Sequence, residues 1–224
     1  MNEGFLPLRF FDPRDEYFVV ERKSLPHWVQ AGAVCFITWR TWDSMPAAVV
    51  SAWLEKRNAW LLQRGIDPAL RAWRLALRQL PPAEQCEFRK ALSERWEGCL
   101  DECHGACLLR DPKLGRIVSD SLMHFDGVRY ALTDFAVMPN HVHVLAAFPS
   151  AESVLPQVDS WKHYTAAAIH RTLGRRGRFW EADGFDHLVR SAEEYAYLRS
   201  YIADNPRRAG LRAGEFVHYQ SALY

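Results

Sequence analysis

The chain has 224 residues, of which 49% are hydrophobic, and its formal net charge is +1. This length suits one domain, or one domain with a large insertion, and the apolar content excludes a disordered chain. No apolar run approaches the roughly 18 to 20 residues of a membrane span. The N-terminus has no basic segment followed by an apolar one, so a cytoplasmic protein without membrane association is expected.

The first third of the chain contains one strand and several helices. Residues 1–32 are mixed and punctuated by proline, and they are expected to form an N-terminal arm. Residues 33–40 are β-rich and apolar and predict the first strand. Apolar residues then recur at helical spacing in three segments, which begin near Pro46, near Asp67-Pro68 and after Pro81-Pro82. These helices carry no catalytic signal, and residues 46–102 are set aside as an all-helical insertion.

Capping and turn residues divide the remainder of the chain. Asp111 followed by Pro112 predicts a helix start, and a serine-led capping box at 191–194 predicts the start of the last helix. Asn205 precedes Pro206, which disfavours the α conformation, so that helix is expected to end at Asp204. The other expected elements are a hairpin of strands 128–137 and 141–148, a helix at 154–172, a loop at 174–177 and a strand at 185–189.

Without the insertion, the expected order is β, α, β, β, α, β, followed by a helix. This order predicts an α+β fold, a ferredoxin-like βαββαβ antiparallel sheet with a C-terminal catalytic helix. Two helices would cover one face of the sheet, which leaves the other face for the last helix. The prediction is a single domain over 1–224, with its catalytic core in 33–45 and 111–211 and a tail at 212–224.

The stretch Met138–Leu145 (MPNHVHVL) carries the strongest chemical signal. His141 and His143 are two residues apart on an expected strand, so their side chains leave the same face, about 7 Å apart at the backbone. Both rings can therefore reach one metal ion, although two strand histidines facing solvent are the alternative. Imidazole suits Mn, Zn, Ni or Fe better than Mg, so ligand type alone does not fix the ion.

A tyrosine and an asparagine on the last helix complete the candidate site. Tyr201 belongs to an apolar stripe and could simply be a core residue. However, Asn205 lies four residues later on the same helix face, so its amide oxygen and the phenol can point at one ion. A phenol is a poor nucleophile, and a divalent ion would compensate by polarising a phosphate. Neutral ligands leave the ion its full charge, which favours a phosphodiester substrate.

Basic residues accumulate near this candidate site. Between Lys162 and Arg212 there are ten Lys or Arg against six Asp or Glu, a difference of +4. A solvated basic face is the alternative to a DNA contact. Arg175, Arg176 and Arg178 are candidates for binding phosphates, which would make DNA binding salt-dependent. Phe179 and Trp180 are candidates either for stacking on unpaired bases or for core packing.

A cysteine-rich segment offers a second metal possibility. Cys99, Cys103, His104 and Cys107 include the residue types of a zinc site. A tetrahedral zinc site usually takes its ligands as two pairs from separate segments, whereas these four lie within nine residues. Reduced thiols of a cytosolic protein are therefore the expected state.

Several motifs together resemble the REP-associated tyrosine transposases, the single-tyrosine branch of the HUH endonucleases. These motifs are His141-Val142-His143 after Met-Pro-Asn, Phe179-Trp180 with FDHLVR at 185–190, and YIADNPRRAGL at 201–211. The segments LPHW at 25–28 and FITWRTWDSMP at 36–46 also resemble the family. The resemblance is weakest over 47–105, where the helices look like an insertion relative to shorter members.

The resemblance implies a metal-dependent single-stranded DNA endonuclease and strand transferase. Its expected partners are single-stranded DNA hairpins of repetitive extragenic palindromes, cleaved through a 5′-phosphotyrosine intermediate by a monomer or homodimer. If the family's residue roles apply to the matching positions of this chain, Tyr201 would be the nucleophile, and His141, His143 and Asn205 would bind Mg²⁺ or Mn²⁺. The residues expected to bind DNA are Lys162, Arg175, Arg176, Arg178, Arg207 and Arg208.

Two other functions are compatible with parts of this pattern. A non-catalytic regulator of the same fold would bind DNA or RNA hairpins without cutting them, but the presence of all four site side chains argues against it. A His-triad nucleotide hydrolase needs a third alternating histidine, and the chain has Leu145 at that position.

Overall fold

The computed structural model describes residues 8–22, 25–70, 72–182 and 184–222. The chain divides into two compact units, one formed by Met1–Trp42 with Ala106–Tyr224 and the other by Asp43–Gly105. Within the described ranges, no helix is both long enough and apolar enough to cross a membrane.

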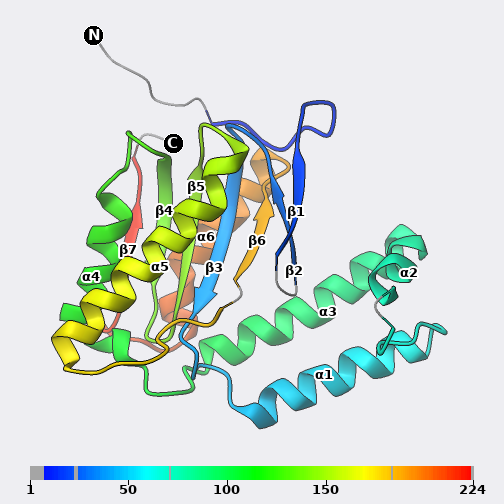
Figure 1. Cartoon of the computed structure of the whole chain (residues 1–224), viewed down its shortest axis with the longest axis horizontal. Helices are drawn as coiled ribbons and strands as arrows, with labels where there is room; N and C mark the ends of the chain where they lie inside the picture. The colour runs from blue at the N-terminus through cyan, green and yellow to red at the C-terminus, as the bar shows by residue number, and fades with distance from the viewer. Residues whose placement is uncertain (1–7, 23–24, 71, 183, 223–224) are drawn as a thin grey trace. The chain divides into compact units, whose positions relative to one another are not determined.

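A five-stranded sheet organises the first unit (Figure 1). Its strand order is β6-β3-β5-β4-β7, and every neighbouring pair is antiparallel. The tight turn between β4 and β5 is closed by a hydrogen bond of 2.8 Å from the Met138 amide to the His141 carbonyl. The strands are β3 (Val34–Arg40), β4 (Ala131–Val137), β5 (His141–Ala147), β6 (Phe185–Leu188) and β7 (Val217–Gln220).

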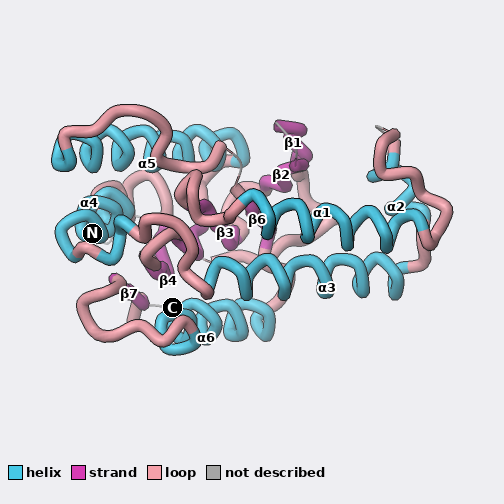
Figure 2. The backbone as a smooth tube through the Cα atoms, turned by 90° about the horizontal axis from the view of Figure 1, so that it is seen from below, coloured by secondary structure: helices cyan, strands magenta, loops and turns pink. Residues whose placement is uncertain are grey.

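Helices cover both faces of this sheet. On one face lie α4 (Pro112–Met123) and α5 (Ala151–Leu173), and on the other lies α6 (Ala192–Arg208), as Figures 1 and 2 both show. The side chains of β5 alternate accordingly. Val142 and Val144 join the core under α4 and α5, whereas Leu145 joins the core under α6. The odd-numbered positions of β5 therefore face α6.

The larger core is rich in tryptophan. The ring of Trp39 stacks on that of Trp161 with centroids 6.0 Å apart. Phe179 and Trp180 are buried in the same cluster, and the indole N–H of Trp180 donates to Thr165 Oγ1 at 2.9 Å. These two aromatic rings therefore pack in the core, and the suggestion that they stack on unpaired bases is wrong.

Two segments expected to lack regular structure contain strands. Within the expected arm, β1 (Phe18–Arg22) pairs antiparallel with β2 (Leu25–Val29), and a hydrogen bond joins Nδ1 of His27 in β2 to the carboxylate of Asp186 in β6. Within the expected tail, β7 adds to the free edge of β4. The two corrections have different causes, because β1 and β2 pair locally with each other, whereas the backbone of β7 is satisfied by a strand distant in sequence.

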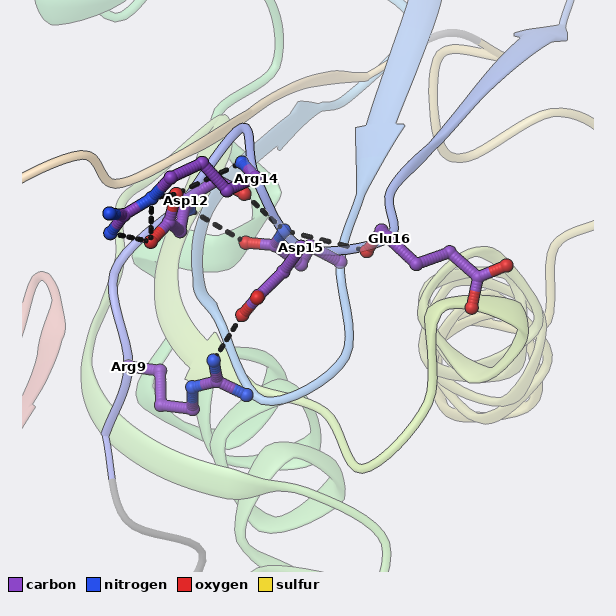
Figure 3. A network of polar contacts seen from close by, with 6 residues as sticks. Arg9, Asp12, Arg14, Asp15 and Glu16 are labelled. Atoms are coloured by element: carbon purple, nitrogen blue, oxygen red, sulfur yellow. Dashed lines mark hydrogen bonds and ion pairs between the residues drawn. The ribbon is translucent and has the colours of Figure 1, made fainter.

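The turn that precedes β1 is held by its own charges (Figure 3). The carboxylate of Asp12 accepts hydrogen bonds from the guanidinium of Arg14, and Arg9 pairs with Asp15. The Arg14 hydrogen bonds lower the pKa of Asp12 to about 2. The side-chain amide of Gln30 donates to the Asp12 carbonyl at 2.8 Å, which ties the turn to the end of β2.

The boundaries of two helices and one strand differ from expectation. The helix α5 begins three residues before the expected start at Val154, directly after Ser150. The strand β4 begins at Ala131, three residues after the expected start at 128, because residues 124–129 form turns closed by a bridge between Asp126 and Tyr130. The helix α6 does not end at Asp204 but continues to Arg208 with Pro206 inside it. Asn205 and Pro206 are both buried, and this packing outweighs the pre-proline preference at Asn205.

The second unit is helical. Its elements are α1 (Ala47–Leu62), α2 (Trp73–Gln79) and α3 (Pro82–Asp101), and α1 and α3 lie side by side in both views (Figures 1 and 2). Leu61, Ile66 and Phe88 form its core. The expected helix after Asp67-Pro68 starts later, at Trp73, because the Asp67 carboxylate accepts from the Ala69 amide and forms a turn. Leu92 and Trp96 belong to the apolar residues expected at helical spacing after Pro81-Pro82, and their side chains lie outside the described part of the structure.

Candidate metal and nucleophile site

The paired histidines lie buried on the α6 face of the sheet. His141 and His143 are 0% and 1% exposed, so they do not face solvent. Their ring centroids are 4.7 Å apart, with the ring planes nearly perpendicular. The alternation of β5 thus presents both imidazoles to the same small volume under α6.

Each ring is oriented by a hydrogen bond at its Nδ1 atom. Nδ1 of His141 lies 2.8 Å from Oδ1 of Asn140, and Nδ1 of His143 lies 2.8 Å from Oγ1 of Thr38. An amide oxygen only accepts, so His141 carries its proton on Nδ1 and keeps a lone pair on Nε2. Metal-binding histidines are typically oriented in this way.

Both Nε2 atoms are buried and neither meets hydrogen-bond geometry with a neighbour. The amide of Asn205 nevertheless lies close enough to His141 to favour its charged form. Burial dominates and lowers the pKa of His141 to about 3. Burial, with smaller effects of His141 and Arg208, also places the pKa of His143 well below its usual value. Both imidazoles are therefore neutral at pH 7, which is the form that binds metals.

The last helix brings a phenol and an amide to these rings. The ring centroids of Tyr201 and His143 are 5.3 Å apart in an edge-to-face arrangement. Asn205 is fully buried, and because α6 continues past it, its side chain stays on the face that carries Tyr201. The hydroxyl of Tyr201 and Oδ1 of Asn205 are both buried atoms. The structure thus brings together the four residues that the sequence suggested as nucleophile and ligands.

The donor set fits a divalent cation. Two buried imidazoles and one amide oxygen offer the nitrogen and oxygen donors that suit a transition metal. Leaving such nitrogens buried without a partner costs free energy, which an ion would recover. Within the described ranges, no group of three or more His, Cys, Asp or Glu side chains is placed to hold a metal. The candidate site is not a group of that kind, because its third ligand is the side-chain amide of Asn205.

The predicted DNA-binding residues fall in different environments. Arg175 and Arg176 are exposed on the loop after α5. Arg178 is ion-paired with Glu181, a residue that also pairs with Arg40 at 3.4 Å. The ammonium group of Lys162 donates to the Ala182 carbonyl at 3.0 Å and so tethers the same loop.

Two further arginines lie at the end of α6. Arg207 pairs with Asp204 at 2.8 Å, and the guanidinium of Arg208 lies over the ring of Tyr201, 5.3 Å from its centroid. Of the six basic residues suggested by the sequence, Arg208 is therefore the one that contacts the candidate nucleophile.

Sequence reasoning missed the two side chains that orient the imidazoles. Asn140 belongs to the Met-Pro-Asn motif before His141, but no role in orienting that ring was predicted for it. Thr38 lies opposite His143 in the antiparallel pairing of β3 with β5. That register depends on residues more than a hundred positions apart, so a single sequence does not reveal it.

A comparison with solved structures finds a REP-associated tyrosine transposase bound to a REP hairpin. The likeness covers 85% of this chain and 76% of that chain, with 10% sequence identity and a TM-score of 0.44. Neither a family model nor a curated protein matches the chain. At this identity and TM-score, the likeness assigns neither a fold family nor an activity.

Proposed function

We propose that this protein is a metal-dependent single-stranded DNA endonuclease and strand transferase that uses Tyr201 as its nucleophile. The observation that carries the proposal is the convergence of two oriented, neutral imidazoles with Tyr201 and Asn205 beneath α6. The resemblance of the sequence motifs supports hairpins of repetitive extragenic palindromes as the substrate. The order β6-β3-β5-β4, with helices in its crossovers, supports a ferredoxin-like core to which β7 is added.

The proposed reaction is a transesterification. The phenol oxygen of Tyr201 attacks the phosphorus, and the bond from phosphorus to the 3′ oxygen breaks. The phenol loses one proton and the leaving 3′ oxygen gains one, so protons balance over the step. The strand then carries a free 3′-OH, and its 5′ phosphate is joined to Tyr201. A 3′-OH attacking that phosphotyrosine restores a phosphodiester without any external energy source, which permits strand joining.

The chain's own residues prepare the site for a cation. Nε2 of His141, Nε2 of His143 and Oδ1 of Asn205 would hold Mg²⁺ or Mn²⁺. When bound, such an ion polarises the scissile phosphate and stabilises the charge that develops on its oxygens. Asn140 and Thr38 fix the two rings, and burial keeps them unprotonated.

Covalent capture tests the proposal directly. The protein is incubated with single-stranded repeat hairpins and Mg²⁺ or Mn²⁺, and denaturing gels are inspected for a protein–DNA adduct. We expect an adduct that requires the metal and that peptide mapping places on Tyr201. Tyr201→Phe removes one oxygen and keeps the ring, so hairpin binding should persist while the adduct disappears. An adduct that persists in Tyr201→Phe, or that maps to another tyrosine, would refute the mechanism.

The second candidate is a non-catalytic regulator that binds DNA or RNA hairpins. One observation favours it, because the hydroxyl of Tyr201 is buried and so is not open to a substrate in this structure. A regulator of this kind would bind hairpins with and without metal and would form no adduct under any condition.

A further inference from the structure

Two adjacent arginines at the end of α6 have different surroundings. Arg207 forms two hydrogen bonds with the Asp204 carboxylate, at 3.1 and 2.8 Å, and its side chain is 77% exposed. Arg208 lies seven positions after Tyr201, two helical turns on, and therefore on the same face. Its guanidinium carbon is 5.3 Å from the centroid of the Tyr201 ring.

The charge of Arg208 also acts on the candidate ligands. Its positive charge is one of the causes that disfavour protonation of His143. The same guanidinium is therefore over the ring of the nucleophile and within electrostatic reach of an imidazole. The side chain is itself exposed, so an incoming strand can contact it.

We propose that Arg208 is a catalytic residue that binds the non-bridging oxygens of the phosphate attacked by Tyr201. This inference rests on the proposed nuclease function and deepens it. Histidine and asparagine bind metals as neutral groups, so His141, His143 and Asn205 would bring no charge of their own to the site. A guanidinium beside the phenol supplies a fixed positive charge where negative charge develops as the phosphorus is attacked. Its planar fork of N–H donors also matches two phosphate oxygens.

A purely structural role for Arg208 makes a different prediction. If the guanidinium only packs on the Tyr201 ring, its removal should affect substrates equally, whatever the charge of the phosphate near the nucleophile. If it binds the attacked phosphate, its removal should matter for one phosphate only. A double-mutant cycle that combines the Arg208 substitution with a change at one phosphate separates the two roles, because the two changes are non-additive only if the groups interact.

The test measures binding of hairpin oligonucleotides in which one phosphate at a time is replaced by a neutral methylphosphonate. All proteins carry Tyr201→Phe to prevent cleavage, and EDTA removes any contribution from a metal. With Arg208 present, we expect one position in the single-stranded flank at which the neutral linkage weakens binding roughly tenfold, the scale of a charge-assisted hydrogen bond. With Arg208→Ala, phosphate and methylphosphonate should bind within about twofold at that position.

Arg207→Ala is the matched control. It removes the same charge from the same helical turn, and it should retain the full discrimination at the sensitive phosphate even if overall affinity falls. Arg208→Lys keeps the charge without the fork, so it should restore part of the discrimination and show that Arg208→Ala has not disturbed folding. Discrimination that survives Arg208→Ala, or that is lost equally in Arg207→Ala, would overturn the inference.

Adduct mapping in the Tyr201 protein then locates the cleaved phosphate. The inference requires that phosphate to be the one that needs Arg208. Cleavage at a different phosphate would overturn the role of Arg208 and leave the nuclease function standing. If no adduct forms on any hairpin, the nuclease function fails, whereas a phosphate that depends on Arg208 would still support the contact itself.

Discussion

Oγ1 of Thr38 lies 2.8 Å from Nδ1 of His143, across the junction of β3 and β5. The bond holds the imidazole in one orientation. We predict that Thr38→Val lowers Mn²⁺ affinity by about 10- to 100-fold, the usual effect of losing a partner that orients a metal ligand. Titration calorimetry on the purified protein measures this.

A threonine elsewhere in the sheet provides a control for that substitution. The hydroxyl of Thr133 is buried and donates to the Leu145 carbonyl at 3.2 Å. Thr133→Val removes a hydroxyl in the same way, and it should leave Mn²⁺ affinity within about twofold of the original. Equal losses in the two variants would mean that Thr38 acts through general stability.

Removal of either imidazole should separate binding from cleavage. We predict that His141→Ala or His143→Ala abolishes the covalent adduct while hairpin affinity changes little, because basic side chains supply most of the affinity for DNA. His163→Ala, which removes an exposed imidazole on α5, is the control and should leave both adduct formation and hairpin affinity unchanged. Both activities are measured with the same labelled hairpin, by gel shift and by denaturing gel. Full cleavage by the double variant would exclude a metal role for these histidines.

The exposed loop after α5 should contribute to the salt dependence of binding. Replacing Arg175, Arg176 and Arg178 by Ala should weaken hairpin binding and reduce the slope of log affinity against log salt by roughly one unit for each lost phosphate contact. Arg178 is paired with Glu181 and so should contribute least.

A triple change on the α4 side is the charge-matched control. Lys113, Arg116 and Arg129 are exposed and lie on or next to α4. Their replacement by Ala should change the salt slope less than the replacement of the three loop arginines does. Identical slopes in the two triple variants would show that the loop arginines do not touch DNA.

The buried imidazoles should make the metal-free protein sensitive to acid. The pKa of His141 is lowered from 6.5 to about 3, so between these values the unfolded chain binds a proton that the folded chain does not. The free energy of unfolding should therefore fall as pH is lowered from 7.5 to 5.5, by roughly 1 kcal/mol for this residue.

Urea unfolding in EDTA at the two pH values measures the effect. His141→Asn replaces the imidazole with a group that does not titrate, so its stability should depend less on pH by about the same amount. Because the pKa of His143 is lowered too, part of the pH dependence of stability should remain in this variant. A dependence that is unchanged by His141→Asn would contradict the assignment.

Local patterns were sufficient to predict much of the site. The alternation around His141 and the turn at Pro139-Asn140 predict the strand, and the capping serine at 191 predicts the start of α6, which the structure confirms. The predicted end of α6 at Asp204 was wrong. The pre-proline preference at Asn205 competed with the burial of that residue, and burial depends on the sheet beneath the helix. Pairings such as Thr38 with His143, and β7 with β4, depend on register between distant segments.

The burial of Tyr201 has an energetic consequence for a nuclease of the proposed kind. Its side chain is 6% exposed and its hydroxyl is fully covered, so no phosphodiester reaches it without some rearrangement. The free energy of that rearrangement has to come from contacts with DNA away from the scissile bond. A strand that binds weakly would leave the phenol covered and remain intact. Selection between strands would then appear in the cleavage rate more than in the binding constant.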